Sequence, residues 1–170
     1  MRILATIFAA LILAGSMPSI SRAEAASELR LEEQFAGRTI ARGHFRAING
    51  VKRDFTVTLH GKWDGKTLAL REDFVFDDGE RDRKTWRFVR TGPGRYTGTR
   101  EDVVGQTHVR IDANVARFSY LVYLDPGERK NKVRFHDTMT LNSDGTVLNT
   151  AWITKIGLPV AWTRVEFRRP

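Results

Sequence analysis

Apolar and polar residues alternate along most of the chain from about residue 39 onward, and short turn sequences interrupt the alternation at intervals. An alternation with a period of two predicts strands that bury one face. Several of the interruptions are Asn-Gly or Asp-Gly pairs, which tolerate positive φ in tight hairpins. The turns are predicted at 49–50, 64–65, 78–79, 92–94, 126–127 and 144–145. The predicted strands are 39–48, 51–63, 66–77, 81–91, 95–102, 106–111, 114–124, 131–142, 146–155 and 159–168.

Sequential strands joined by short turns predict an all-β antiparallel up-and-down meander. An open meander exposes two edges, so we expect it to close into a lipocalin-like barrel of about 8–10 strands. A two-sheet sandwich is the alternative. A membrane-spanning barrel fits less well, because the outward faces carry charges such as Lys52, Asp54 and Arg134 instead of an apolar band. The only helix expected is short, from Ser27, a possible cap, to Phe35.

The first residues have the pattern of a secretory signal peptide. Arg2 is followed by the apolar run 3–14, and Ala23-Glu24-Ala25 offers a small-x-small cleavage site. The run is shorter than the roughly 20 residues that span a bilayer. We therefore expect a signal peptide over 1–25 and one barrel domain over 26–170.

The amino-acid composition indicates in which compartment the protein acts and which classes of partner to expect. The chain has 28 Lys and Arg against 20 Asp and Glu, a net charge of +8, and no cysteine. The missing cysteine excludes disulfides, thiol nucleophiles, Cys-ligated metals and a lipid anchor on an N-terminal Cys. An export signal without thiols suggests a soluble periplasmic protein, for which nucleic acid is not an expected partner.

Acidic side chains fall on faces that should be apolar. Glu72 lies among Leu70, Phe74 and Phe76 when its strand is read by twos, and Asp137 interrupts a similar row in 131–142. In the next strand, the inward face predicted from Val147, Ala151 and Ile153 also contains the polar residues Asn149 and Lys155. A three-residue turn at 78–80 would pair Glu72 with Trp86 and Leu70 with Phe88.

An ionised carboxylate removed from water without a partner costs several kcal/mol. Glu72 and Asp137 should therefore be protonated, face a wet cavity, or pair with Arg53, Arg100 or Lys155 in a structural network. In the last case Glu72→Gln should destabilise the fold. The other interpretations are that the carboxylates orient a ligand or act as general bases.

Other signals are weaker. The four histidines, at 44, 60, 108 and 136, lack the spacing of a metal site and are expected on the surface, and neither a metal nor a cofactor is predicted. Trp63, Trp86, Trp152 and Trp162 are expected in the core or at the barrel closure. Basic residues at 81–84 and 129–132 lie beside hairpin turns, where they are solvated or contact an anionic membrane surface.

A family resemblance rests on several motifs spread over nearly the whole chain after residue 25. They are Leu70 to Glu80 followed by Trp86, Tyr96-Thr97-Gly98, Asp102 to Gly105, Asn114, Asp137 with Met139, and Leu148-Asn149 to Lys155-Ile156-Gly157. In this combination the chain resembles the bacterial domain-of-unknown-function family 3833. The resemblance implies a cell-envelope protein of β-barrel fold, often a lipoprotein, with genes frequently near those for fatty-acid cyclopropanation.

The chain departs from the family pattern in three places. It lacks the lipobox cysteine, it has Ala113 where glycine usually precedes Asn114, and His136-Asp137-Thr138 replaces Asp-Asp-Trp. The first departure argues against a lipid anchor, and the others touch the predicted interior.

Pattern and resemblance together predict a periplasmic lipocalin-like protein that binds an apolar or lipid-derived small molecule in the envelope. The alternatives are an enzyme that acts on such a molecule through its interior carboxylates, and a structural or interaction protein with a filled barrel. The candidate ligand-binding residues are Glu72, Trp86, Tyr96, Asn114, Asp137, Asn149 and Lys155.

Overall fold

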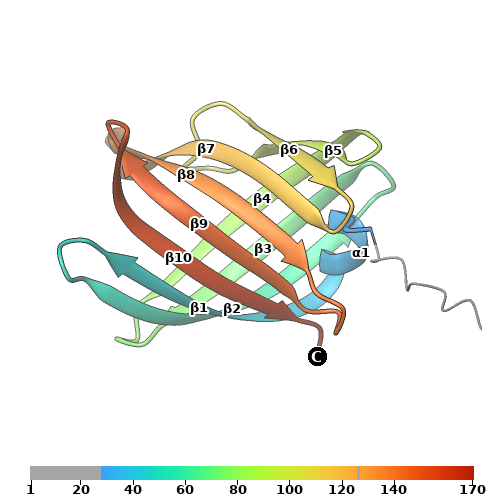
Figure 1. Cartoon of the computed structure of the whole chain (residues 1–170), viewed down its shortest axis with the longest axis horizontal. Coiled ribbons are helices and arrows are strands. Elements are labelled where there is room, and N and C mark those ends of the chain that lie inside the picture. The colour runs from blue at the N-terminus through green and yellow to red at the C-terminus, as the bar shows by residue number, and fades with distance from the viewer. Residues whose placement is uncertain (1–27, 126) are drawn as a thin grey trace, which may run out of the picture.

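The computed structural model describes residues 28–125 and 127–170, and these form an antiparallel β-barrel preceded by one short helix (Figure 1). The predicted signal peptide lies outside the described residues. In chain order the elements are α1 (Leu31–Phe35), β1 (Gly37–Ala47), β2 (Lys52–Trp63), β3 (Thr67–Phe76), β4 (Arg81–Gly92), β5 (Arg95–Thr99), β6 (Thr107–Asp112), β7 (Val115–Asp125), β8 (Lys130–Leu141), β9 (Val147–Lys155) and β10 (Leu158–Arg168).

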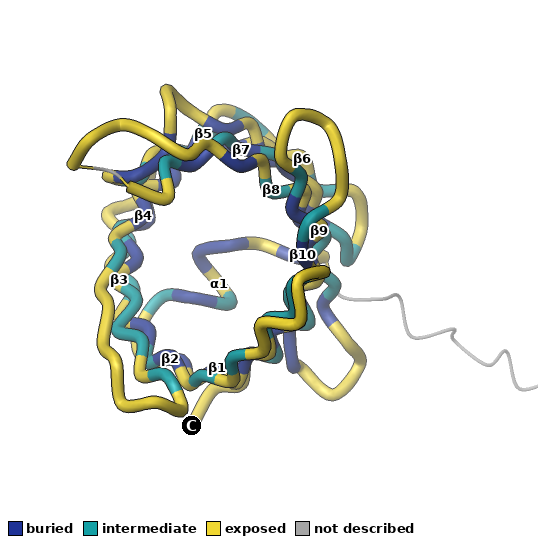
Figure 2. The backbone as a smooth tube through the Cα atoms, turned by 90° about the vertical axis from the view of Figure 1, so that its left-hand side faces the viewer, coloured by how far each residue is buried: buried dark blue, intermediate teal, exposed yellow. Residues whose placement is uncertain are grey.

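The sheet closes on itself, as predicted. Each strand pairs with its neighbours in sequence, and β1 completes the ring by pairing with β10 from Ile40–Arg168 to Ala47–Ala161. Viewed along the barrel, the strands form a complete ring (Figure 2). Closure pairs both edges that an open meander would expose. The lipocalin-like barrel is confirmed, and the two-sheet sandwich is not found.

Alternation decides which side chains face inward. Along β3, Leu68 and Leu70 are buried, whereas the next residue of the strand, Arg71, faces outward and is exposed. β7, β8 and β9 show the same period of two. Among the described residues, no helix has the length and apolar character that crossing a bilayer requires.

The register of the β3–β4 hairpin differs from the prediction. Glu72 lies opposite Lys84, and Trp86 lies opposite Leu70, two positions from the predicted pairing. The turn has three residues, as predicted, but it lies one position earlier, over 77–79, because the Phe76 amide donates to the Glu80 carbonyl at 2.9 Å. A shift of two residues leaves every side chain on the same face, so Glu72 and Trp86 still point inward.

Helix α1 lies across one end of the barrel (Figures 1 and 2). It buries Leu31 and Phe35 against the core, and the ring of Phe35 packs edge-on against Phe167 at 5.3 Å between centroids. The predicted helix ran from Ser27 to Phe35, and its part from Leu31 to Phe35 is confirmed. The proposed cap Ser27 lies outside the described residues. Arg30 occupies the N-cap position without a capping side chain.

The helix approaches β2 so closely that only glycine fits beneath it. A Cβ added at Gly61 would lie 1.8 Å from the Phe35 carbonyl oxygen. Gly61→Ala should therefore displace α1 and lower the free energy of unfolding by about 1–3 kcal/mol, as overpacking does. Urea unfolding checks this, with Gly92→Ala as the control because a Cβ there meets no atom within 4 Å. Equal stability of the two variants would contradict this packing.

Candidate functional site

The barrel is not filled by its own side chains. A cavity of about 230 Å³ runs from α1 toward the opposite end of the barrel. Its wall is mainly aromatic, and Trp86 and Tyr120 meet edge to face at 5.0 Å between ring centroids. Other rings in the wall are Phe55, Phe74, Phe118 and Phe135. A concave aromatic space with a few polar groups is the usual form of a small-molecule site.

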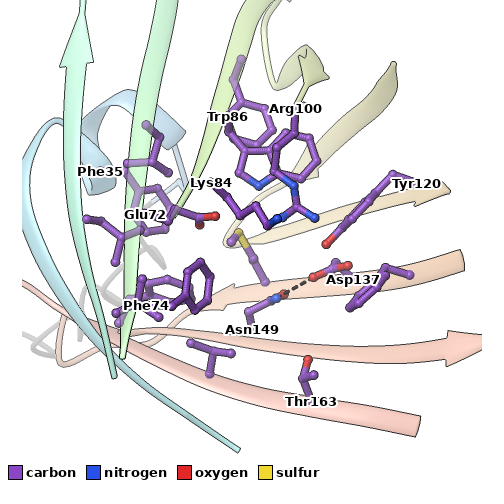
Figure 3. Close-up of a pocket in the computed structure, with 18 of the residues that line it drawn as sticks. Phe35, Glu72, Phe74, Lys84, Trp86, Arg100, Tyr120, Asp137, Asn149 and Thr163 are labelled. Atoms are coloured by element: carbon purple, nitrogen blue, oxygen red, sulfur yellow. Dashed lines mark hydrogen bonds between the residues drawn. The ribbon is translucent and has the colours of Figure 1, made fainter. Parts of the chain in front are cut away.

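Polar side chains from opposite walls point into this apolar space (Figure 3). Glu72 comes from β3 and Lys84 from β4, while Asp137 and Asn149 come from the adjacent strands β8 and β9. Arg100 reaches in from the loop after β5. The barrel thus brings together residues that are far apart in sequence.

Arg100 is held by a buried ion pair. Its Nε donates to Asp102 Oδ1 at 2.6 Å and its Nη2 to Asp102 Oδ2 at 3.2 Å, with Arg100 and Asp102 side chains only 11% and 5% exposed. Lys84 Nζ lies 3.5 Å from the same carboxylate. The guanidinium also lies over the Trp86 ring, 4.8 Å from its centroid. Such charge-assisted, two-point contacts are stronger than hydrogen bonds between neutral groups, and each charge has a buried partner of opposite sign.

Glu72 has no such partner. Burial raises the pKa of Glu72 to about 7, and the positive charge of Arg100 opposes this shift only in part. No hydrogen bond to its carboxylate from another described residue contributes to its pKa. Desolvation without a directly bound cation keeps a carboxyl group protonated near neutral pH. Glu72 is therefore a titratable group that faces the cavity.

Asp137 is partly satisfied. Its Oδ1 accepts a 2.6 Å hydrogen bond from Asn149 Nδ2. Burial raises the pKa of Asp137 to about 6, against the effect of that hydrogen bond. The second carboxylate oxygen of Asp137 and the amide oxygen of Asn149 are buried without a hydrogen-bond partner among the described residues. The hydroxyl of Tyr120 points toward Asp137 (Figure 3), and burial raises the pKa of Tyr120 well above its usual value.

Four of the seven predicted site residues line the cavity: Glu72, Trp86, Asp137 and Asn149. The prediction that Lys155 points inward is wrong. Lys155 is the last residue of β9 and is exposed, because the strand has left the core where the hairpin turn begins. The proposed partner Arg53 pairs instead with Asp78 and Glu80 beside the β3–β4 turn.

Tyr96 and Asn114 have structural contacts elsewhere. Tyr96 is buried, and its hydroxyl donates to Glu32 of α1 at 2.5 Å, which ties the helix to β5. The Asn114 side chain donates to the Leu141 carbonyl at 2.9 Å and joins the β6–β7 turn to the end of β8. Neither residue lines the cavity.

The sequence interpretation missed Lys84 and Tyr120 as cavity residues. The signal was present, because the alternation that places Trp86 and Phe88 inward also places Lys84 inward, and Tyr120 follows Phe118 in the same way. Arg100 was considered only as a pairing partner for the carboxylates. In the predicted strand 95–102 it lies on the same face as Tyr96, so the alternation was enough to place it inward.

Two tryptophans lie where the prediction did not expect them. Trp86 is buried and Trp63 half-buried, but Trp152 is 60% and Trp162 42% exposed on the outer face of β9 and β10. Their rings neighbour each other at 6.2 Å between centroids. The histidines are exposed, as predicted, and the described part of the chain holds no cluster of three or more potential metal ligands.

Comparison with known proteins identifies a family and a fold. The family described as "Protein of unknown function (DUF3833)" matches residues 10–169, which confirms the resemblance. No curated protein matches the chain. The S-type phycobiliprotein lyase CPES from Guillardia theta has a similar structure, with a TM-score of 0.58 and 8% identity over 81% of this chain and 89% of that one. A DUF3598-family protein of unknown function from Nostoc punctiforme has a TM-score of 0.54 and 13% identity over 86% of this chain and 51% of that one.

Proposed function

Since this chain belongs to the DUF3833 family of proteins of unknown function, we propose its function from its own cavity: it binds an apolar or lipid-derived small molecule in the cell envelope. The observation that carries the proposal is the aromatic cavity of about 230 Å³, closed at one end by α1. This volume is below the roughly 300–1,000 Å³ of pockets for drug-sized ligands. A single short chain or one small ring system fits it best.

The proposal places the protein in the periplasm, as a soluble protein released by signal cleavage. Its support is the apolar run and the Ala23-Glu24-Ala25 sequence, together with the absence of cysteine. The test is osmotic shock of the producing cells followed by N-terminal sequencing of the released protein, which should begin near Ala26. Retention of Met1 in a membrane fraction would contradict it.

Ligand binding is tested on protein from that periplasmic fraction. Native mass spectrometry should show an adduct that organic extraction removes, and the extracted protein should bind the apolar dye N-phenylnaphthylamine. Met139→Trp should abolish dye binding, because Met139 lines the cavity and a larger ring fills it. Thr138→Trp is the matched control, since the adjacent residue of a strand points to the opposite face. Absence of both adduct and dye binding would overturn the proposal.

A second function, catalysis by an interior carboxylate, has one observation in its favour. Burial raises the pKa of Glu72 to about 7, which suits a general base at neutral pH. An enzyme would change the mass of the extracted molecule on incubation, and Glu72→Gln would stop that change while leaving dye binding intact. A molecule that returns unchanged after prolonged incubation favours binding alone.

The proposal includes contact with an anionic membrane surface at the end of the barrel opposite α1. The turns between β1 and β2, β7 and β8, and β9 and β10 lie at that end (Figure 1). In or beside them are exposed large apolar side chains, which we call the apolar rim: Ile48, Leu124, Ile156 and Leu158. Ile156 is 95% exposed. Arg129, Lys130, Lys132 and Lys155 lie in or beside the same turns. Apolar tips beside basic residues suit a surface of anionic headgroups.

Backbone strain at the apolar rim supports this contact. Ile156 has φ of 50°, a left-handed conformation that β-branched residues rarely adopt. Strain retained at an exposed site is more often connected with function than with stability.

Ile156→Asn should therefore act in opposite directions on stability and membrane binding. Asparagine tolerates the left-handed conformation, so the free energy of unfolding should rise by about 1 kcal/mol, while cosedimentation with phosphatidylglycerol vesicles should fall. Ala113→Gly is the control, because Ala113 has φ of 49° in the β6–β7 turn, at the α1 end of the barrel. It should raise stability without changing vesicle binding. Unchanged cosedimentation of Ile156→Asn would contradict the membrane contact.

A further inference from the structure

Some of the polar groups that face the cavity have hydrogen-bond partners in the protein, and others remain free to bind a ligand. Asp137 and Asn149 are 5% and 8% exposed, and each has one side-chain oxygen without a hydrogen-bond partner among the described residues. Both oxygens are acceptors. Buried acceptors are normally satisfied, and leaving them unpaired costs free energy. The Tyr120 hydroxyl points toward Asp137 and helps to lower its pKa (Figure 3), whereas no described residue donates to the Asn149 oxygen. A further hydrogen-bond donor can therefore be accepted at this point of the cavity.

The cations of the cavity are already engaged. Arg100 forms two hydrogen bonds with Asp102, and Lys84 Nζ lies 3.2 Å from Asp82 and 3.5 Å from Asp102. The positive charges of Arg100 and Lys84 are therefore balanced by the negative charges of Asp82 and Asp102. Glu72 and Asp137 remain as two further carboxyl groups without a cation in direct contact. Tyr120 adds a neutral hydroxyl whose pKa is raised by burial.

Glu72 and Asp137 face the same space from opposite walls. In Figure 3 the Glu72 carboxyl group on β3 and the Asp137–Asn149 pair on β8 and β9 both point toward the middle of the cavity, with Phe74 and Trp86 beside them. A compact charged group between them would meet acceptors on both sides, and its apolar part would contact the aromatic wall.

We infer that the cavity selects amphipathic ligands whose polar end is a hydrogen-bond-donating cation, such as a primary ammonium group on a short alkyl or aryl chain. The inference rests on the proposed function and names the ligand class of the same site. Asp137 and Asn149 accept the hydrogen bonds of the ammonium group, and Glu72 supplies the second negative charge. A carboxylate ligand would instead add a further negative charge to a cavity whose cations are occupied.

The sign of the pH dependence follows from the groups that face the ligand. These are Glu72, Asp82, Lys84, Arg100, Asp102, Tyr120 and Asp137. Burial raises the pKa of Asp137 to about 6 and of Glu72 to about 7, so both ionise between pH 5 and pH 8. Affinity for an ammonium group should therefore increase over this range, and affinity for a carboxylate should decrease.

The experiment compares octylamine, octanol and octanoate by calorimetry on the extracted full-length mature protein. At pH 8 octylamine should bind at least about tenfold more tightly than octanoate, the expected size of one charge-assisted hydrogen bond. The preference should shrink at pH 5, while octanol binding stays constant. Octanoate binding as tightly as octylamine would overturn the inference. It would leave the proposed function standing, since that depends on dye binding.

Variants assign the effect to the carboxylates. Asp137→Asn should weaken octylamine binding about tenfold and leave octanol binding unchanged. Glu72→Gln serves as the second variant if Asp137→Asn does not fold, and it should remove the pH dependence centred near 7. The exposed Glu128→Gln is the control and should change neither affinity. If octylamine binds both cavity variants as it binds wild type, the inference is wrong.

Discussion

Replacing Arg100 by methionine should lower the free energy of unfolding by about 3–5 kcal/mol, because removal of one partner leaves a buried charge uncompensated. Asp102 would lose both hydrogen bonds from Arg100 and keep only the longer contact with Lys84. The methionine would also lose the guanidinium's contact with the Trp86 ring. In a domain of this size the melting temperature should fall by about 10 °C or more.

Calorimetry or urea unfolding measures the effect, and Lys84→Met is the matched control. Lys84 is more exposed and contacts Asp102 at 3.5 Å, so its loss should cost clearly less. The double variant Arg100→Met/Asp102→Leu should recover most of the stability, since replacing a whole buried pair by apolar residues is often neutral. An Arg100→Met protein as stable as wild type would show that the pair does not hold the loop after β5.

Glu72→Gln should stabilise the protein at pH 8 and leave its stability unchanged near pH 4. The pKa of Glu72 is raised from 4.5 to about 7 by burial, so below pH 4.5 the group is neutral in the folded and unfolded states. Between these values the unfolded chain releases the proton and the folded chain retains it, so the stability of the wild type falls as pH rises. Glutamine removes that loss, which corresponds to roughly 3 kcal/mol for complete desolvation and less if water enters the cavity.

This result would be opposite to the one expected for a structural ion pair at Glu72. Urea unfolding of wild type and variant at pH 4, 6 and 8 gives the answer as a difference that grows with pH. Glu128→Gln, on an exposed turn, should follow the wild type at each pH. A Glu72→Gln variant that is less stable at pH 8 would indicate a cation in contact with the carboxylate.

The barrel was predictable from sequence because its two signals are local. Alternation fixes which face of a strand is buried, and glycine-containing pairs fix where the chain turns. Glu72 and Asp137 were therefore placed inward correctly. A period of two says nothing about height along the barrel, however, so Lys155 and Glu72 looked equivalent although only Glu72 lies level with the core.

The polar centre of the cavity was harder to predict because it depends on loop geometry. Arg100 and Asp102 lie just after β5, where the predicted strand continued to residue 102 and the observed one ends at Thr99. The alternation of the predicted strand gives the face of Arg100, but it does not predict the ion pair between Arg100 and Asp102. The exposed Trp152 and Trp162 were misjudged because large apolar residues were assumed to lie inside.

The pairing of β1 with β10 has a consequence for how the molecule reaches its folded state. Ile40, near the start of the described chain, finds its partner Arg168 only two residues before its end. A contact of this separation forms late and slowly, since the whole intervening chain must be ordered first. Until the last strand arrives, the edges of β1 and β9 remain open to pairing with other chains. Synthesis from the N-terminus therefore leaves the barrel open until β10 has been made.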